Sequence, residues 1–187
     1  MGSIVSRWIL KALGWSILKQ LPDSQKYVAI AAPHTSNWDF PLGILAASAM
    51  RLEINWIGKH TLFRWPYGWF FRAIGGIPIE RGVGTNLSRQ MAAQFAQTDK
   101  LVLAIAPEGT RSKLDHWKTG FYYIALAAEV PIALGCLDYQ HKQVGISDSF
   151  IPSGDIEADF EIIGKYYQDK VGKIPQQAGT IRPRKLK

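Results

Sequence analysis

The sequence predicts an α/β fold with a mostly parallel or mixed central sheet, flanked by helices and preceded by an amphipathic helix. Short apolar runs typical of buried strands alternate with helical segments along the chain. The 187 residues suit one domain with a sizeable core, and no repeat, low-complexity tract or linker divides them. We therefore expect an N-terminal helix within residues 1 to 20, a single domain over 21 to 180 and a basic tail over 181 to 187.

The N-terminal segment predicts a helix over residues 4 to 19 with one apolar side. That side is formed by Ile4, Val5, Trp8, Ile9, Leu13 and Ile17. Basic residues such as Arg7 and Lys11 lie mainly elsewhere. A short basic amphipathic helix with tryptophans suits the plane of a membrane interface, and packing on the core of its own domain is the alternative.

Strands and helices are then expected in alternation. The expected strands lie at residues 27 to 32, 54 to 58, 77 to 80, 101 to 106 and 132 to 137, with a further one near Val144. The expected helices lie at residues 37 to 50, 85 to 98, 119 to 128 and 155 to 168. The tail is basic and expected to be mobile from residue 182 onward. In sheets of this kind, sites gather at the loops that leave the strand ends, and here those loops hold the polar clusters.

The composition narrows the class of protein and of partner. With 47% apolar and 20% charged residues, the chain is expected to be globular. A formal charge of +7 indicates an anionic partner, but charge alone does not separate nucleic acid, anionic lipid and phosphorylated substrates. The single cysteine, Cys136, excludes an internal disulfide framework and suits a reducing compartment. No run reaches the ~18 uninterrupted apolar residues of a spanning helix, so we expect a soluble or peripheral protein.

The first candidate site follows the expected strand at residues 27 to 32. His34 comes where that strand ends, and Asp39 falls in the first turn of the next helix. The Asp39 carboxylate could orient one imidazole nitrogen while the other takes a proton from a substrate hydroxyl. In the alternative interpretation, Ser36 and Asp39 form a capping box that serves only the helix, and His34 is a hydrogen-bonded loop residue.

Cations follow three other expected strands. Arg111, within Pro107–Ser112, offers a fork of donors to a phosphate, and Gly109 lets the backbone approach a ligand closely. Arg81 and Lys59 follow two further strands. Each cation alone is typical of a solvated surface, whereas three of them at separate strand ends beside a His–Asp pair favour an anion site.

An aromatic stretch from residue 62 to 74 has no clean helical period. It is either a connection packed on the core, an apolar wall for an acyl chain, or a patch at a membrane interface. We assign Trp65, Trp69 and Phe70, together with Trp8, to the acyl-facing or membrane-facing role.

Taken together, these loops resemble the glycerolipid acyltransferase family, the lysophosphatidic acid acyltransferases and their relatives. The His-x4-Asp signature of the family matches His34 and Asp39. Its second block resembles Gly76–Arg81, and its third, Pro-Glu-Gly-Thr-Arg-Ser, is present intact at Pro107–Ser112. The blocks occur in family order over roughly residues 27 to 138, and the ordered set is more specific than any one of them.

The later motifs are similar to those of the family but less strict. Trp117–Gly120 resembles the Phe-Lys-x-Gly that often follows the third block, and Pro131 resembles the proline of the fourth. Two positions depart from the pattern, because Pro33 stands where many members have Asn and Glu80 where Asp is common. The first departure removes any contact that an Asn side chain would make.

The resemblance implies a glycerophosphate-acyltransferase-like sandwich and a role for each matching residue. His34 would be the general base and Asp39 its orienting partner. Arg81 and Arg111 would hold the phosphate of the acceptor, with Lys59 as a further contact. As a mechanistic hypothesis separate from the resemblance, we expect amides at the start of the helix at residues 37 to 50 to stabilise the oxyanion.

The resemblance also implies the pocket and the partners. Glu108, Gly109 and Thr110 would shape the acceptor pocket, with Glu108 able to bond a glycerol hydroxyl. The partners would be a lysophospholipid acceptor such as 1-acylglycerol-3-phosphate, acyl-CoA or acyl carrier protein as donor, and an anionic membrane surface. No cofactor, metal or nucleic acid is expected, and the protein would be peripheral at the cytoplasmic face of a membrane.

Three other functions stay open from the residues alone. A thioester hydrolase would use water as the acceptor. A phosphate-ester hydrolase would use His34 and the arginines, although the sequence supplies no usual set of metal ligands for it. A non-enzymatic basic protein that binds membrane or nucleic acid would explain the charge and the tail, but the chain has no recognition helix or RNA-binding aromatic signature.

Overall fold

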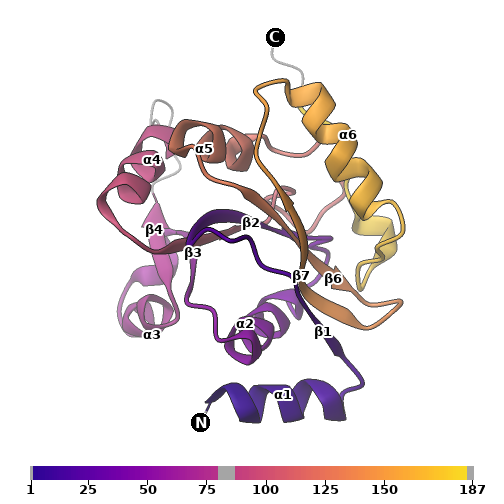
Figure 1. The fold of residues 1–187 in the computed structure, drawn as a ribbon. Coiled ribbons are helices and arrows are strands. Elements are labelled where there is room, and N and C mark those ends of the chain that lie inside the picture. Colours follow the sequence, from indigo (N-terminus) through magenta and orange to yellow (C-terminus); the bar gives the residue numbers. More distant parts are fainter. Residues whose placement is uncertain (1, 80–86, 185–187) are drawn as a thin grey trace.

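The computed structural model describes residues 2 to 79 and 87 to 184, and shows a seven-stranded sheet with helices on both faces (Figure 1). The strands are β1 (Ser16–Lys19), β2 (Lys26–Ala32), β3 (Ile54–Lys59), β4 (Gly76–Ile79), β5 (Leu101–Ile105), β6 (Ile132–Asp138) and β7 (Gln143–Phe150). Their order in the sheet is β1-β7-β6-β2-β5-β3-β4. All neighbours pair in parallel except β6 and β7, so the expected mixed sheet is confirmed.

Helices cover both faces of the sheet. They are α1 (Gly2–Ala12), α2 (Asp39–Met50), α3 (Gly68–Ala73), α4 (Leu87–Gln97), α5 (Gly120–Ala128) and α6 (Ile156–Tyr167), with short 3-10 helices η1 (His60–Phe63) and η2 (Pro175–Gln177). Figure 1 shows α4, α5 and α6 over one face and α2 over the other, with α1 outside α2. None of the helices in the described ranges has both the length and the apolar character that crossing a bilayer requires.

The two faces of the sheet carry separate clusters of buried side chains. The larger cluster joins Ile30 of β2 to Phe121 of α5 and Phe160 of α6. A smaller cluster on the other face joins Leu10 of α1 and Leu42 of α2 to the sheet. The central strands β2 and β6 are buried on both faces, and their nearly continuous apolar sequences are typical of such strands.

The prediction of one helix over residues 4 to 19 is wrong. The helix ends at Ala12, where Gly14 takes a φ of +77° that side-chain-bearing residues rarely adopt. Residues 16 to 19 then form β1, which pairs with β7 at the edge of the sheet. The apolar residue Ile17 prolonged the apparent helical pattern, although its partner is Val144 in the sheet.

The helix α1 both packs on the domain and exposes an apolar side. Leu10 is fully buried against α2, and Arg7 Nε donates to Ala49 O at 2.9 Å. Ile4 and Trp8 are 57% and 67% exposed. Packing on the core and exposure of an apolar side were expected as alternatives. In the structure both occur, on different sides of the helix.

The other expected elements are confirmed to within a few residues. The strand near Val144 is the eight-residue β7, and the aromatic stretch folds as η1 and α3. The start of the helix expected at residues 85 to 98 and the end of the strand expected at 77 to 80 lie outside the described residues. The first residues of the basic tail contact the domain, because Trp117 N donates to Arg182 O at 2.9 Å and Pro183 is buried beside Trp117. The tail from residue 185 onward lies outside the described residues.

The docking of α1 yields a stability prediction. We expect Leu10→Ala to lower the free energy of unfolding by about 2–5 kcal/mol, since it removes a fully buried side chain. The control Ile4→Ala, on the exposed side of the same helix, is expected to change it by less than about 0.5 kcal/mol. Urea unfolding followed by circular dichroism measures both, and equal losses would show that α1 is not part of the core.

Candidate active site

The predicted site residues meet at one edge of the sheet. His34 follows β2, Glu108 and Arg111 follow β5, and Lys59 ends β3. These strands run in parallel, so their carboxyl ends lie at the same edge. Arg81, expected at the end of β4, lies outside the described residues.

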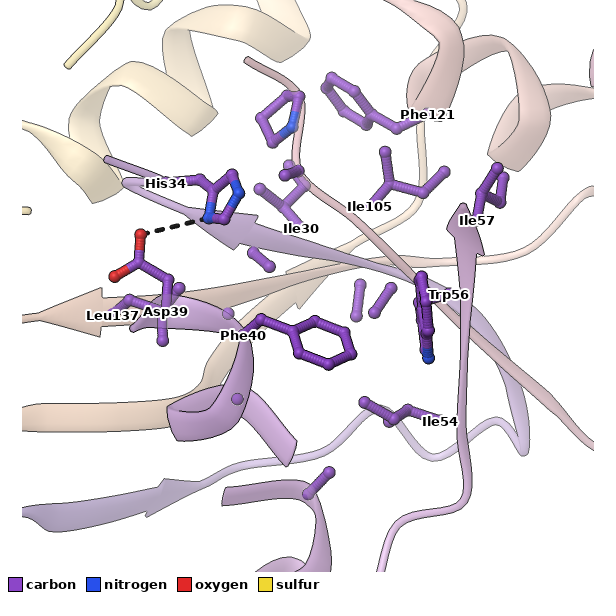
Figure 2. A pocket seen from close by; sticks show the side chains of 18 of the residues that line it. Ile30, His34, Asp39, Phe40, Ile54, Trp56, Ile57, Ile105, Phe121 and Leu137 are labelled. Carbon is purple, nitrogen blue, oxygen red and sulfur yellow. Dashed lines mark ion pairs between the residues drawn. The ribbon is translucent and has the colours of Figure 1, made fainter. Parts of the chain in front are cut away.

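His34 and Asp39 face each other across the short loop between β2 and α2. The distance between His34 Nδ1 and Asp39 Oδ2 is 3.2 Å, and Figure 2 shows the imidazole turned toward the carboxylate. The His34 side chain keeps 19% of its surface exposed, whereas that of Asp39 has none. One ring nitrogen is thus occupied by the carboxylate, and the ring remains accessible from the cavity that it lines.

The Asp39 carboxylate also organises its own loop. Its Oδ2 accepts hydrogen bonds from Thr35 N and Ser36 N, both at 2.8 Å, and its Oδ1 accepts one from Tyr139 Oη at 2.7 Å. Burial alone would raise the pKa of Asp39, but the hydrogen bonds of His34, Tyr139 and Ser36 outweigh burial and leave the pKa below its ordinary value. The capping interpretation and the catalytic one are therefore compatible. The oxyanion donors were expected among the amides at the start of the next helix. The neighbouring amides of Thr35 and Ser36 donate to Asp39 and therefore do not face the cavity as oxyanion donors.

Glu108 has a different position from the expected one. Its carboxylate is buried, accepts a hydrogen bond from His34 N at 2.8 Å, and does not line the large cavity that His34 lines. Burial raises the pKa of Glu108 to about 7, although the hydrogen bond from the His34 backbone opposes that rise. Glu108 was expected to shape the acceptor pocket. In this structure its carboxylate instead bonds the loop that carries His34.

Cations gather at the mouth of the cavity. Lys59, Arg111 and Lys118 line it together with Gly109 and Thr110. Gly109 has a φ of +61°, and a Cβ at this position would lie 2.6 Å from Lys118 Nζ. The positive φ is the reason for glycine here, since the flexible Lys118 side chain could move away from a Cβ. Lys118 lies in the motif at Trp117–Gly120 and had no predicted role.

Behind this mouth the cavity is large and mainly apolar. Its volume is about 810 Å³, within the range of roughly 300–1,000 Å³ of small-molecule sites. It extends between α2 and the sheet, where Gly43 and Ala47 line it from the helix and Ala29 and Ala104 from the strands. In Figure 2, the Phe40 ring lies across the cavity from His34, next to Trp56 of β3.

The four aromatic residues that were assigned an acyl-facing or membrane-facing role are on the surface. Trp65 is 93% exposed and Trp69 is 73% exposed, and Trp8 and Phe70 are also exposed. None of these four lines the cavity. Its aromatic wall instead comes from Phe40, Trp56 and Phe71, which are in edge contact through Trp56.

Sequence reasoning missed Tyr139, which follows β6 and bonds Asp39. Its signal was available, because it is a polar residue in the loop that follows the expected strand at residues 132 to 137, two positions after the end of that strand. Within the ranges that the structure covers, no group of three or more His, Cys, Asp or Glu side chains is arranged to hold a metal ion.

The chain is similar in sequence to known acyltransferases. The 1-acyl-sn-glycerol-3-phosphate acyltransferase of Haemophilus influenzae is 26% identical over 156 residues, which cover 77% of this chain and 64% of the relative. The protein of the same name from Salmonella typhimurium is 30% identical over 122 residues, 62% of this chain and 49% of the relative. The chain thus spans between half and two thirds of the length of these relatives.

The fold and the sequence family agree. The crystal structure of the 1-acyl-sn-glycerophosphate (LPA) acyltransferase PlsC from Thermotoga maritima superposes with a TM-score of 0.56, covering 90% of this chain and 74% of that one. The two sequences are 17% identical, so this likeness shows the fold alone. The model of the acyltransferase family matches residues 15 to 133, which is more than half of the chain. The protein therefore belongs to the acyltransferase family.

Proposed function

We propose that the protein transfers a fatty acyl group from a thioester to a hydroxyl of a lysophospholipid such as 1-acylglycerol-3-phosphate. The observation that carries the proposal is the His34–Asp39 pair at the mouth of a cavity that is cationic outside and apolar inside. A lysophospholipid and a fatty acyl thioester have this same division into an anionic end and an apolar chain. The relatives named as 1-acyl-sn-glycerol-3-phosphate acyltransferases support the acceptor class.

His34 acts as the general base of this reaction. Asp39 holds Nδ1, so Nε2 takes the proton of the acceptor hydroxyl as its oxygen attacks the thioester carbonyl carbon. The carbon–sulfur bond then breaks, the thiolate of the carrier takes the proton from His34, and an ester remains. Either acyl-CoA or acyl carrier protein can supply the thioester in this scheme.

The phosphate of the acceptor lies among the cations of the cavity mouth. Arg111 offers two parallel donors to phosphate oxygens, and Lys59 and Lys118 add charge from two other segments. We keep Arg81 in this set as a proposal from the sequence. A phosphate held by these cations fixes which hydroxyl of the acceptor faces His34.

The acyl chain occupies the apolar part of the cavity under α2. Glycine and alanine at the lining positions leave room between the helix and the sheet, and a Cβ added at Gly43 would meet nothing within 4 Å. The chain length that the protein accepts is then set by how far this space extends.

A membrane surface supplies the lipid acceptor. The exposed side of α1 carries Ile4 and Trp8, and the segment before and within α3 carries Trp65 and Trp69. Figure 1 shows α1 and α3 on the same side of the sheet as α2. Exposed tryptophans beside basic residues are typical of peripheral proteins at anionic interfaces. The buried free Cys136 agrees with the cytoplasmic side of that membrane.

The catalytic role of His34 is tested by its substitution. We expect His34→Ala to lower the rate of acyl transfer by about 10²–10⁴, since it removes the base. The measurement follows thiol release from acyl-CoA in the presence of lysophosphatidic acid, and mass spectrometry identifies the ester. The matched control is His116→Ala, because His116 also lies beside an aspartate but outside the cavity.

Two results would count against this assignment. Equal rates for the native protein and His34→Ala would remove His34 from the mechanism. Thiol release that is unaffected by leaving out the lipid would indicate a thioester hydrolase.

The acyl cavity is tested by filling it. Gly43→Leu places a side chain in open space on α2, so we expect the preferred acyl donor to shift to shorter chains while the protein stays folded. Competition between acyl-CoA donors of different length measures the shift. Ala93→Leu, on the exposed side of α4, is the control, and an unchanged preference for Gly43→Leu would place the chain elsewhere.

The membrane surface is tested with vesicles. We expect Trp8→Ala combined with Trp65→Ala and Trp69→Ala to reduce cosedimentation with phosphatidylglycerol vesicles about tenfold or more, because each exposed indole favours the interface. Ile151→Ala, which removes a 65%-exposed side chain elsewhere, should leave cosedimentation unchanged. Equal cosedimentation of all three proteins would refute this surface.

A further inference from the structure

Tyr139 and His34 contact different oxygens of the Asp39 carboxylate. Asp39 Oδ2 faces His34 Nδ1 and accepts hydrogen bonds from its own loop. Asp39 Oδ1 accepts a hydrogen bond from the Tyr139 hydroxyl at 2.7 Å. The two residues are 100 positions apart in the chain. Burial and the bond to Asp39 raise the pKa of Tyr139 well above its ordinary value, so the hydroxyl is a protonated donor at neutral pH.

The turn that carries Tyr139 is held firmly. Tyr139 N donates to Val171 O at 2.8 Å. The preceding residue, Asp138, is fully buried, and its Oδ1 accepts from Gln140 N at 3.1 Å and His141 N at 3.3 Å. The backbone of Tyr139 is thus fixed between β6 and β7, independently of Asp39.

The Tyr139 ring is fixed by Trp15. The two rings meet edge to face, with their centroids 5.0 Å apart and their planes at 88°. Trp15 follows α1, and its backbone N donates to Leu10 O at 2.8 Å. Leu10 is the buried residue that packs α1 on the core. An aromatic contact of this geometry restricts ring rotation and therefore the position of the hydroxyl.

We infer that Tyr139 is a positioning residue of the His34–Asp39 pair, held in place by Trp15. The inference rests on the proposed function. With both carboxylate oxygens occupied, the Asp39 side chain cannot rotate about its last bond, so Oδ2 stays directed at His34 Nδ1. Loss of the Tyr139 hydroxyl would leave Oδ1 without that bond in a fully buried carboxylate and would free the rotation.

The test compares two tyrosines that make the same kind of bond. Tyr122 Oη donates to Asp159 Oδ2 at 2.8 Å, in a buried contact between α5 and α6. We expect Tyr139→Phe to lower kcat about 10- to 100-fold with KM nearly unchanged, as loss of a hydrogen bond to a charged group implies. Tyr122→Phe is expected to reduce stability without this effect on kcat.

A second measurement does not depend on activity. The protonation of His34 is followed by nitrogen-15 NMR in the native protein and in both variants. The charged groups that interact with His34 are Asp39 and Glu108, while Lys59, Arg111 and Lys118 line the same cavity, and none of the five is altered. We expect the midpoint to move to higher pH only in Tyr139→Phe, because a carboxylate that has lost a donor attracts the imidazole proton more strongly.

The outcomes separate the two proposals. A native protein without acyl transfer would overturn the proposed function, while the NMR comparison would still decide the role of Tyr139. An unchanged midpoint in Tyr139→Phe, or the same change in Tyr122→Phe, would overturn the inference. Trp15→Leu should lower kcat in the native background and have little further effect in the Tyr139→Phe background.

Discussion

A carboxylate with no exposed surface must be surrounded by donors, and the Asp39 carboxylate imposes this requirement on the whole site. Its partners come from its own loop and from the turn after β6. Because two partners are backbone amides and the third is a tyrosine whose ring packs on Trp15, the carboxylate has one orientation. His34 takes its own orientation from that carboxylate, so the position of the reactive nitrogen follows from the satisfaction of a buried charge.

The loops around this charge are held together by the C-terminal segment from residue 171 to 183. Ile174 N donates to Thr35 Oγ1 at 3.1 Å, and Thr180 N donates to Leu114 O at 3.0 Å. In the orientation that satisfies both of its amide atoms, the Gln177 side chain donates to Arg111 O and Thr35 O. The loops after β2 and β5 are thus both bonded to this C-terminal segment, and the Glu108 side chain adds a direct hydrogen bond between the two loops.

The sheet and most helices could be predicted because burial on both faces produces apolar runs whose length distinguishes strand from helix. That His34, Asp39 and Arg111 lie at one edge of the sheet could also be predicted, since each follows such a run and the ends of parallel strands converge. The end of α1 could not, because the apolar spacing of residues 4 to 19 suits a helix and only Gly14 marks the break. The position of Glu108 could not either, because whether a carboxylate enters a cavity or bonds a neighbouring loop depends on the packing of segments far apart in sequence.

The contact of Tyr139 with Asp39 links the site to distant parts of the fold. It connects the turn between β6 and β7, and through Trp15 the end of α1, to the carboxylate that holds His34. The side of α1 away from this contact is exposed and apolar. The residues proposed to meet a membrane and those proposed to perform the chemistry therefore belong to one continuous packed structure.

The position of the proton on His34 tests this account most directly. Neutron diffraction from deuterated crystals, grown at alkaline pH where the imidazole is neutral, locates it. The account predicts deuterium on Nδ1, directed at Asp39 Oδ2, and a bare Nε2 facing the cavity. Deuterium on Nε2 with a bare Nδ1 beside the carboxylate would contradict it, because the nitrogen available to the acceptor could not then take a proton.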